Sequence, residues 1–217
     1  MSERLPSARG AVYGSRLARF LVWLGWRRSV HGAELVPRTG PVILAPNHLG
    51  FLDGPFLFGV CPRPVHTLTK HEMFAGPLGW VLRWVGQIPI DRDQPGRAAL
   101  QAVTAVLADG RVVAIYPEGT RGVGDFSELR PGLAWFALRS GAPVVPVVFL
   151  GSGSRGTTLG SLPRFRSRLQ VVFGEPVHVG TGDGRTSRAA LQAASEELRD
   201  ALVAHHRQAY QKFGGQA

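Results

Sequence analysis

Apolar runs alternate with amphipathic stretches along most of the chain from residue 41 onward. Short apolar runs rich in β-branched residues predict strands at residues 41–48, 65–70, 87–90, 111–119, 143–150 and 167–177. Apolar residues at helical spacing predict a short helix opened by Asp53-Gly-Pro55 and longer helices at 77–86, 96–109, 132–140 and 187–208. This alternation predicts an α/β fold, with a mainly parallel mixed sheet flanked by helices on both faces.

The N-terminal segment, residues 11–29, has a different pattern and predicts an amphipathic helix. Bulky apolar residues from Phe20 to Trp26 are bracketed by four arginines: Arg16, Arg19, Arg27 and Arg28. Trp23 and Trp26 are three residues apart, so they lie on one side of a helix. We interpret this helix as membrane-associating, with tryptophan at headgroup depth and arginine near lipid phosphates. The alternative is a helix packed on the core of the domain. We divide the chain into this helix, residues 1–29, and one domain, residues 30–217.

Composition adds a strong positive charge. The 217 residues include 25 lysines and arginines against 15 aspartates and glutamates, a net charge of +10. Such an excess attracts anionic lipid surfaces, phosphorylated substrates or nucleic acid. The aromatic residues cluster in apolar stretches and no recognised nucleic-acid-binding motif is present, so nucleic acid is the least favoured of the three. The single cysteine, Cys61, rules out an intramolecular disulfide, and we expect it to be a small buried apolar residue.

Polar residues gather where the predicted strands end, which in parallel sheets is where chemistry collects. Asn47 and His48 follow the first strand, and Asp53 comes five residues after His48. Positions i and i+5 do not face each other on one helix, so the pair meets only if the chain turns between them. Asp53 would then orient the imidazole of His48 and leave its other nitrogen free as a general base. The pattern H-x4-D alone is weak, because a capping aspartate and a loop histidine produce it as well.

A second group of polar residues follows later strands. The buried run at 111–119 ends in Tyr-Pro-Glu-Gly-Thr-Arg, residues 116–121, which places a carboxylate, a hydroxyl and a guanidinium on one loop. Gly119 permits close approach of a ligand to the backbone, and Arg121 suits bidentate binding of a phosphate. Lys70 and Arg92 add two cations at other strand ends. Taken one at a time, each of these residues is equally consistent with a solvated polar turn.

Taken in order, the segments NHLGFLD, KHEMF, GPLGW, QIPIDR, YPEGTR and APVVPVVF resemble the glycerolipid acyltransferase family. The likeness is greatest to the 1-acylglycerol-3-phosphate acyltransferases, and it covers residues 28–180. It implies that His48 is the general base and Asp53 its orienting carboxylate. It also implies that Arg92 and the loop of Glu118, Gly119, Thr120 and Arg121 bind the glycerol phosphate of the acceptor. Asn47 is counted with this substrate-binding group. Lys70 is expected either to join it or to stabilise the thioester oxyanion.

The resemblance therefore implies acyl transfer from an acyl-CoA or acyl carrier protein thioester to lysophosphatidic acid, giving phosphatidic acid in phospholipid biosynthesis. Residues 30–217 would form the acyltransferase domain, with no metal and no bound cofactor. We expect the protein on the cytoplasmic side of the cell membrane, bound peripherally or monotopically to anionic lipid. Three alternatives stay open: another acceptor such as glycerol-3-phosphate or a different lysolipid, a non-catalytic lipid-binding module, and a basic nucleic-acid-binding protein. Gly122 stands where the family often has a small hydroxyl residue, which bears on the acceptor head group rather than on the chemistry.

Overall fold

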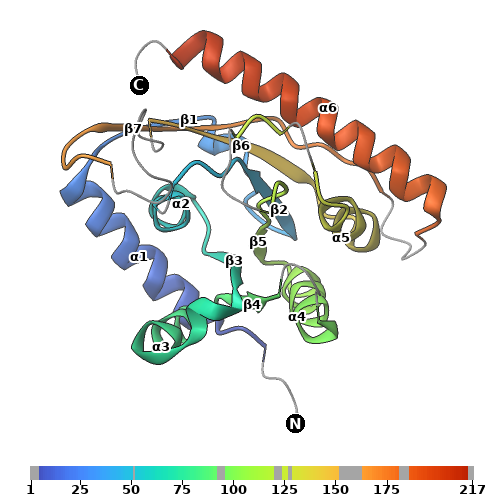
Figure 1. The fold of residues 1–217 in the computed structure, drawn as a ribbon, viewed down its shortest axis with the longest axis horizontal. Coiled ribbons are helices and arrows are strands. Elements are labelled where there is room, and N and C mark those ends of the chain that lie inside the picture. The colour runs from blue at the N-terminus through green and yellow to red at the C-terminus, as the bar shows by residue number, and fades with distance from the viewer. Residues whose placement is uncertain are drawn as a thin grey trace.

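Strands and helices alternate along almost the whole chain in the computed structural model (Figure 1). It describes residues 5–50, 52–91, 96–119, 124–126, 129–151, 163–180 and 186–214. The strands are β1 (Arg27–His31), β2 (Val42–Pro46), β3 (Val65–Lys70), β4 (Ile88–Ile90), β5 (Val112–Ala114), β6 (Val144–Leu150) and β7 (Arg168–Phe173). The α-helices are α1 (Ala8–Gly25), α2 (Asp53–Val60), α3 (Gly76–Trp84), α4 (Arg97–Ala108), α5 (Gly132–Ser140) and α6 (Arg188–Phe213). Every helix and strand predicted from the sequence has a counterpart among them.

The strands form one sheet in the order β1-β7-β6-β2-β5-β3-β4. All described pairs are parallel except β6 and β7, where Val147 lies opposite Phe173 in an antiparallel ladder. The predicted mainly parallel mixed sheet is therefore confirmed. Because β2, β5 and β3 are parallel neighbours, the residues that follow them emerge at the same edge of the sheet.

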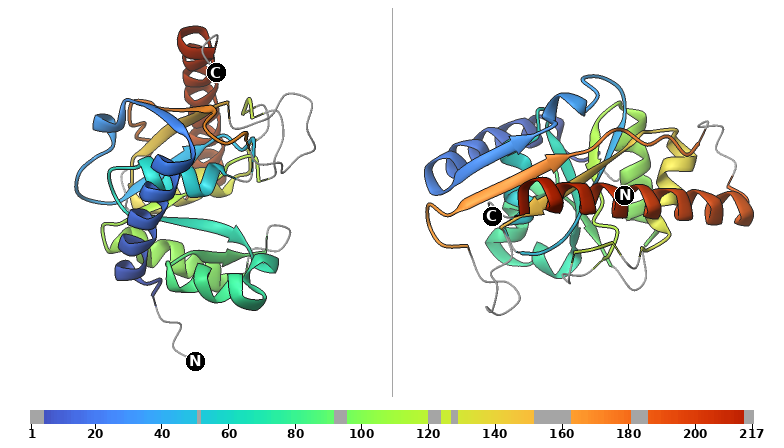
Figure 2. Two further views of the ribbon diagram at one scale, coloured as in Figure 1. Left: turned by 90° about the vertical axis from the view of Figure 1, so that its left-hand side faces the viewer. Right: turned by 90° about the horizontal axis from the view of Figure 1, so that it is seen from above.

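Two layers of helices bury the two faces of this sheet (Figure 2). Successive residues of β2 point to opposite faces, so Val42 and Leu44 pack toward α1 and α2, whereas Ile43 and Ala45 pack toward α4, α5 and α6. Both sets are fully buried, which explains why the central strands have continuous apolar sequences instead of alternating ones.

The N-terminal segment corrects one sequence prediction. We expected a helix over residues 11–29, but α1 ends at Gly25 and residues 27–31 form the edge strand β1, parallel to β7. Trp26 already has an extended backbone, with φ −141° and ψ 153°. The sequence of β1, RRSVH, lacks an apolar pattern of its own. The local sequence cannot reveal its pairing with β7, because the partner residues lie 141 positions further along the chain, as in the pair Arg27 and Arg168. The division predicted at residue 29 falls inside this strand.

The N-terminal part of helix α1 contacts the C-terminal end of α3. The rings of Tyr13 and Trp84 stack with centroids 6.1 Å apart. A Cβ atom added at Gly10 would lie 1.7 Å from the backbone carbonyl oxygen of Trp84, and one at Gly14 would lie 2.9 Å from Val85. These glycines therefore let the two helices approach, and that approach defines one wall of the candidate site described below.

We expect Gly10→Ala to lower the free energy of unfolding by about 1–3 kcal/mol, the usual cost of overpacking. Alanine is otherwise the better helix former by about 1 kcal/mol, so only the contact with Trp84 predicts a loss. Gly132→Ala in the first turn of α5 is the matched control, since a Cβ atom there meets nothing within 4 Å. Denaturant titration of both variants decides the matter, and a Gly10→Ala protein as stable as the control contradicts this packing.

Candidate active site

The loop that follows β2 brings His48 and Asp53 together. The Nδ1 atom of His48 lies 3.0 Å from the Oδ2 atom of Asp53. The same oxygen accepts hydrogen bonds from the backbone N–H groups of Leu49, at 2.7 Å, and Gly50, at 2.8 Å. Asp53 is fully buried and is the first residue of α2, where the helix dipole favours a negative charge. The carboxylate of Asp53 thus stabilises the turn between the two residues, and this turn places the carboxylate beside His48.

This geometry fixes the tautomer of the imidazole. An ionised carboxylate only accepts hydrogen bonds, so the Nδ1 atom of His48 carries the hydrogen and Nε2 keeps its lone pair. The ring of Tyr116, which follows β5, packs against that of His48 with centroids 4.4 Å apart. The His48 side chain is about 11% exposed, which limits the rotamers open to it while leaving one edge accessible. The arrangement is that of an oriented general base.

Asn47, the residue before the base, anchors the end of β2 through its side chain. Its Oδ1 atom accepts a hydrogen bond from the backbone N–H of Phe149 at 2.7 Å, and its Nδ2 atom donates to the carbonyl oxygens of Phe149 and Gly124, both at 3.4 Å. Asn47 is fully buried. It therefore ties the exit of β2 to β6, which is a positioning role, whereas the sequence analysis placed it among the substrate-binding residues.

The turn after β5 is the second part of the site. Gly119 has φ +72°, and a Cβ atom there would lie 2.4 Å from the Nε atom of Arg130. Arg130 was not singled out from the sequence, because nothing in its local sequence separates it from other surface arginines. The structure places its guanidinium over the turn that carries Glu118. Thr120 and Arg121, the other predicted members of this loop, lie outside the described residues.

Glu118 is directed inward instead of toward solvent. Its Oε1 atom accepts a hydrogen bond from the backbone N–H of Phe126 at 3.0 Å. Burial raises the pKa of Glu118 above its ordinary value, and the negative charges of Asp125 and Asp53 add to the rise, while the backbone N–H groups of Phe126 and His48 oppose it. Glu118 thus links this turn to the backbone of the histidine loop.

Lys70 lies at the carboxyl end of β3, and its Nζ atom is 3.4 Å from Glu72 at the surface. With its side chain half exposed, it contributes a positive charge near the site without being buried in it. Arg92, predicted at the next strand end, lies outside the described residues. Cys61 is fully buried, and burial raises the pKa of its thiol to about 11, as expected for an inert apolar residue.

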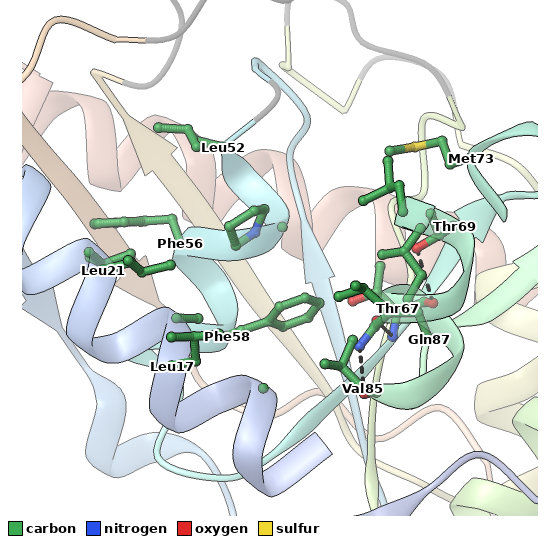
Figure 3. Close-up of a pocket in the computed structure, with 18 of the residues that line it drawn as sticks. Leu17, Leu21, Leu52, Phe56, Phe58, Thr67, Thr69, Met73, Val85 and Gln87 are labelled. Atoms are coloured by element: carbon green, nitrogen blue, oxygen red, sulfur yellow. Dashed lines mark hydrogen bonds between the residues drawn. The ribbon is translucent and has the colours of Figure 1, made fainter. Parts of the chain in front are cut away.

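A large, mostly apolar cavity of about 1040 Å³ begins at His48 and runs between α1, α2, α3 and β3. Figure 3 shows Leu17 and Leu21 of α1 on one wall, with Phe58 of α2 pointing across the cavity toward Thr67 and Val85. Tyr116 and Lys70 also line it, so the histidine, the turn after β5 and the predicted cation share one space. A cavity of this size and polarity suits a long apolar ligand whose reactive end lies at His48.

Comparisons with known proteins agree with this architecture. A family model described as Acyltransferase matches residues 27–150. The chain is 29% identical over 175 residues to a 1-acyl-sn-glycerol-3-phosphate acyltransferase of Bacillus subtilis, a match that covers 80% of this chain and 85% of that protein. A relative of the same name from Chlamydomonas reinhardtii is 35% identical over 184 residues, which cover 82% of this chain and 55% of that protein. The chain thus spans about half of the algal relative.

A solved structure shows the same fold. The crystal structure of a 1-acyl-sn-glycerophosphate acyltransferase from Thermotoga maritima superposes with a TM-score of 0.64 and 23% identity, covering 90% of this chain and 77% of that one. This likeness supports the topology of the sheet and the placement of the helix layers.

The half-buried position of Glu118 leads to a prediction about stability. A carboxyl group whose pKa is raised by folding binds its proton more tightly in the folded state, so its ionisation destabilises the protein as pH rises above the ordinary value. Glu118→Gln keeps an acceptor for Phe126 and cannot ionise. We therefore expect a higher Tm than wild type at pH 8, with the difference shrinking as pH falls toward 4.5.

Thermal unfolding of both proteins across this pH range measures the effect. Glu197→Gln is the control, because Glu197 is exposed on α6. A Tm difference for Glu118→Gln that stays constant with pH, or grows toward acid, is inconsistent with a buried carboxyl of raised pKa.

Proposed function

The chain belongs to the acyltransferase family and is an O-acyltransferase, and from this premise we propose that it acylates lysophosphatidic acid to phosphatidic acid. The observation that carries the proposal is the buried His48–Asp53 pair, whose histidine lines a large apolar cavity. A base at one end of such a cavity matches a substrate with a reactive carbonyl on a long alkyl chain. The donor is the thioester of acyl-CoA or of acyl carrier protein, and lysophosphatidic acid is the acceptor that the names of the relatives indicate.

His48 begins the reaction as a general base. Its Nε2 atom removes the proton of the free glycerol hydroxyl while the oxygen attacks the thioester carbonyl carbon. The resulting imidazolium is stabilised by the Asp53 carboxylate at 3.0 Å. When the tetrahedral intermediate collapses, the carbon–sulfur bond breaks, and the imidazolium returns its proton to the leaving thiolate. A positioned base of this kind typically contributes about 10²–10⁴-fold to the rate. The step invokes no metal and no bound cofactor.

The acyl chain occupies the cavity between α1, α2 and α3. Its walls are mostly apolar side chains, many of them leucine, valine and phenylalanine, so transfer of methylene groups from water is favourable, by about 0.8 kcal/mol for each one buried. On the β3 side, the amide of Gln87 is paired within the wall, since it accepts from the N–H of Thr67 at 2.8 Å and donates to the carbonyl of Val85 at 3.1 Å. The buried hydroxyl of Thr67 has no hydrogen-bond partner among the described residues, so it is one polar atom in an otherwise mostly apolar wall.

The phosphate of the acceptor binds to cations near His48, at the carboxyl edge of the sheet. We assign this role to Arg121 and Arg92 from the family pattern, with Lys70 beside them at the cavity wall. Arg130 is an additional candidate because its guanidinium covers Gly119 in the turn that leads to these residues. Gly119 has a left-handed backbone conformation and no side chain, so its backbone lies close to the guanidinium of Arg130. A side chain at this position would displace Arg130.

The enzyme works at the cytoplasmic face of an anionic membrane, where α1 supplies the contact. Phe20, Trp23 and Leu24 are 56%, 63% and 55% exposed on α1, which is too much apolar surface for a helix facing only water. No helix in the described part of the chain is long and apolar enough to cross a bilayer. Two residues expected to contact lipid have other partners: Trp26 donates to the carbonyl of Pro163, and Arg19 donates to the carbonyls of Gly59 and Cys61 at the end of α2.

Two substitutions test the dyad. We expect His48→Ala to abolish acyl transfer above background and Asp53→Asn to lower kcat by about 10²–10⁴-fold, because the imidazole loses its orienting charge. The assay is incubation of purified protein and vesicles with labelled acyl-CoA or acyl carrier protein. The acceptors are lysophosphatidic acid, glycerol-3-phosphate and other lysolipids.

Each variant must retain the wild-type Tm and far-ultraviolet circular dichroism for the comparison to count. Wild-type turnover by His48→Ala would refute the proposed base. Preference of the wild-type enzyme for an acceptor without a phosphate would leave the base in place but overturn the assignment of lysophosphatidic acid.

A further inference from the structure

The segment that leads into β7, Pro163–Arg168, forms a turn that exposes one aromatic residue and three arginines. Phe165 is 69% exposed, as much as any large apolar residue in the described part of the chain. Arg164, Arg166 and Arg168 surround it, and all three are exposed. An aromatic ring exposed between arginines leaves apolar area unburied, so within the described part of the chain this area of the turn has no partner.

Backbone and side-chain hydrogen bonds fix this turn to the end of α1. The N–H of Arg166 donates to the carbonyl of Gly25 at 2.7 Å, and the N–H of Arg27 donates to the carbonyl of Ser167 at 3.0 Å. The indole N–H of Trp26 donates to Pro163 at 3.4 Å. Arg166 itself has φ +61°, a left-handed conformation that a residue with a side chain adopts only when its surroundings require it. Phe165 thus lies on a turn that hydrogen bonds hold to the end of α1 and the start of β1.

The apolar surface around Phe165 is continuous with that of α1. A Cβ atom at Gly25 would lie 3.9 Å from the ring of Phe165, and Phe165 lines the same cavity as Leu21 and Leu24. Helix α3 extends this surface through Trp80, which is 69% exposed, and through the stack of Trp84 on Tyr13. In Figure 1 the orange turn, α1 and α3 lie along one side of the molecule. Residues of α1, of α3 and of this turn all line the cavity.

Positive charge borders this apolar surface at the active-site edge of the sheet. Arg27 and Arg168 are register partners on β1 and β7, and Arg28, Arg164 and Arg166 are exposed next to them. Within the described residues, none of these five arginines forms an ion pair. Apolar side chains bordered by unpaired arginines match a bilayer with anionic headgroups, since the rings enter the acyl boundary and guanidinium groups bind phosphates. A protein partner would have to supply both an apolar and an acidic surface of the same layout.

We propose that the Pro163–Arg168 turn is a second membrane-contacting element, in which Phe165 inserts beside α1 and the arginines bind lipid phosphates. The three elements then hold the cavity mouth against the bilayer. A lysolipid enters sideways between α1, α3 and the turn, so its alkyl chain is never exposed to water. The route of entry rests on the proposed function, whereas the membrane contact does not.

Binding of the full-length protein to vesicles tests the contact without turnover. We expect the combined variant Arg164→Gln, Arg166→Gln, Arg168→Gln to bind phosphatidylcholine vesicles containing phosphatidylglycerol on the order of 100-fold more weakly, about fivefold for each arginine. The charge-matched control is Arg188→Gln, Arg199→Gln, Arg207→Gln, all exposed on α6, which covers the opposite face of the sheet. Phe165→Ser should weaken binding by roughly tenfold or more, and Phe165→Trp should retain it.

Cosedimentation with vesicles gives these affinities, and His48→Ala should bind like wild type whether or not the enzyme acylates lysophosphatidic acid. Equal loss in the two arginine variants would reduce the effect to net charge and overturn the proposal, as would wild-type binding by the turn variant or by Phe165→Ser. With a short-chain acceptor dissolved as monomer, the turn arginine variant should keep wild-type kcat/KM, and it should lose activity only on vesicle-borne acceptor. Equal loss on both acceptors would place these arginines in the chemistry and contradict a membrane role.

Discussion

A single buried carboxylate oxygen organises the site. The Oδ2 atom of Asp53 accepts the imidazole N–H of His48 and the N–H groups of Leu49 and Gly50, so one charge both shapes the loop and orients the base. Burying a carboxylate is costly unless its hydrogen bonds are made, and here three donors converge on one oxygen. The five-residue spacing of the H-x4-D pattern follows from this geometry, because the chain must leave β2, turn and enter α2 within reach of that oxygen.

The rest of the structure forms the cavity in which we propose that the substrate of this pair binds. Helices α1, α2 and α3 enclose an apolar cavity on one face of the sheet, while α4, α5 and α6 close the other face and carry no part of the cavity lining. In the proposed mechanism the cavity holds the alkyl chain, the strand ends supply the base and the cations, and exposed aromatic rings with arginines face the lipid. The base therefore lies at the edge of the sheet, whereas the cavity and the proposed lipid-facing surface both belong to the helix layer on one of its faces.

Much of this architecture could be predicted from the sequence, since strands β2, β5 and β6 are continuous apolar runs and α5 begins and ends at the expected residues. The contact between His48 and Asp53 could also be predicted, because a turn between residues five positions apart brings them together whereas a continuous helix does not. Strand β1 could not, since its five residues become a strand through pairing with distant β7. The positioning role of Asn47, the inward direction of Glu118 and the brace between Trp26 and Pro163 depend on contacts 8 to 137 positions apart, which local patterns do not encode.

The central claim is that His48 and Asp53 act as one unit, and a double-mutant cycle tests it most directly. The rate constant of acyl transfer is measured for wild type, His48→Ala, Asp53→Asn and the protein with both changes. If Asp53 works by orienting the imidazole, the double variant should be no slower than His48→Ala alone, as is usual for residues that act together. Losses that multiply independently would contradict the account, because Asp53 would then contribute to catalysis without the histidine.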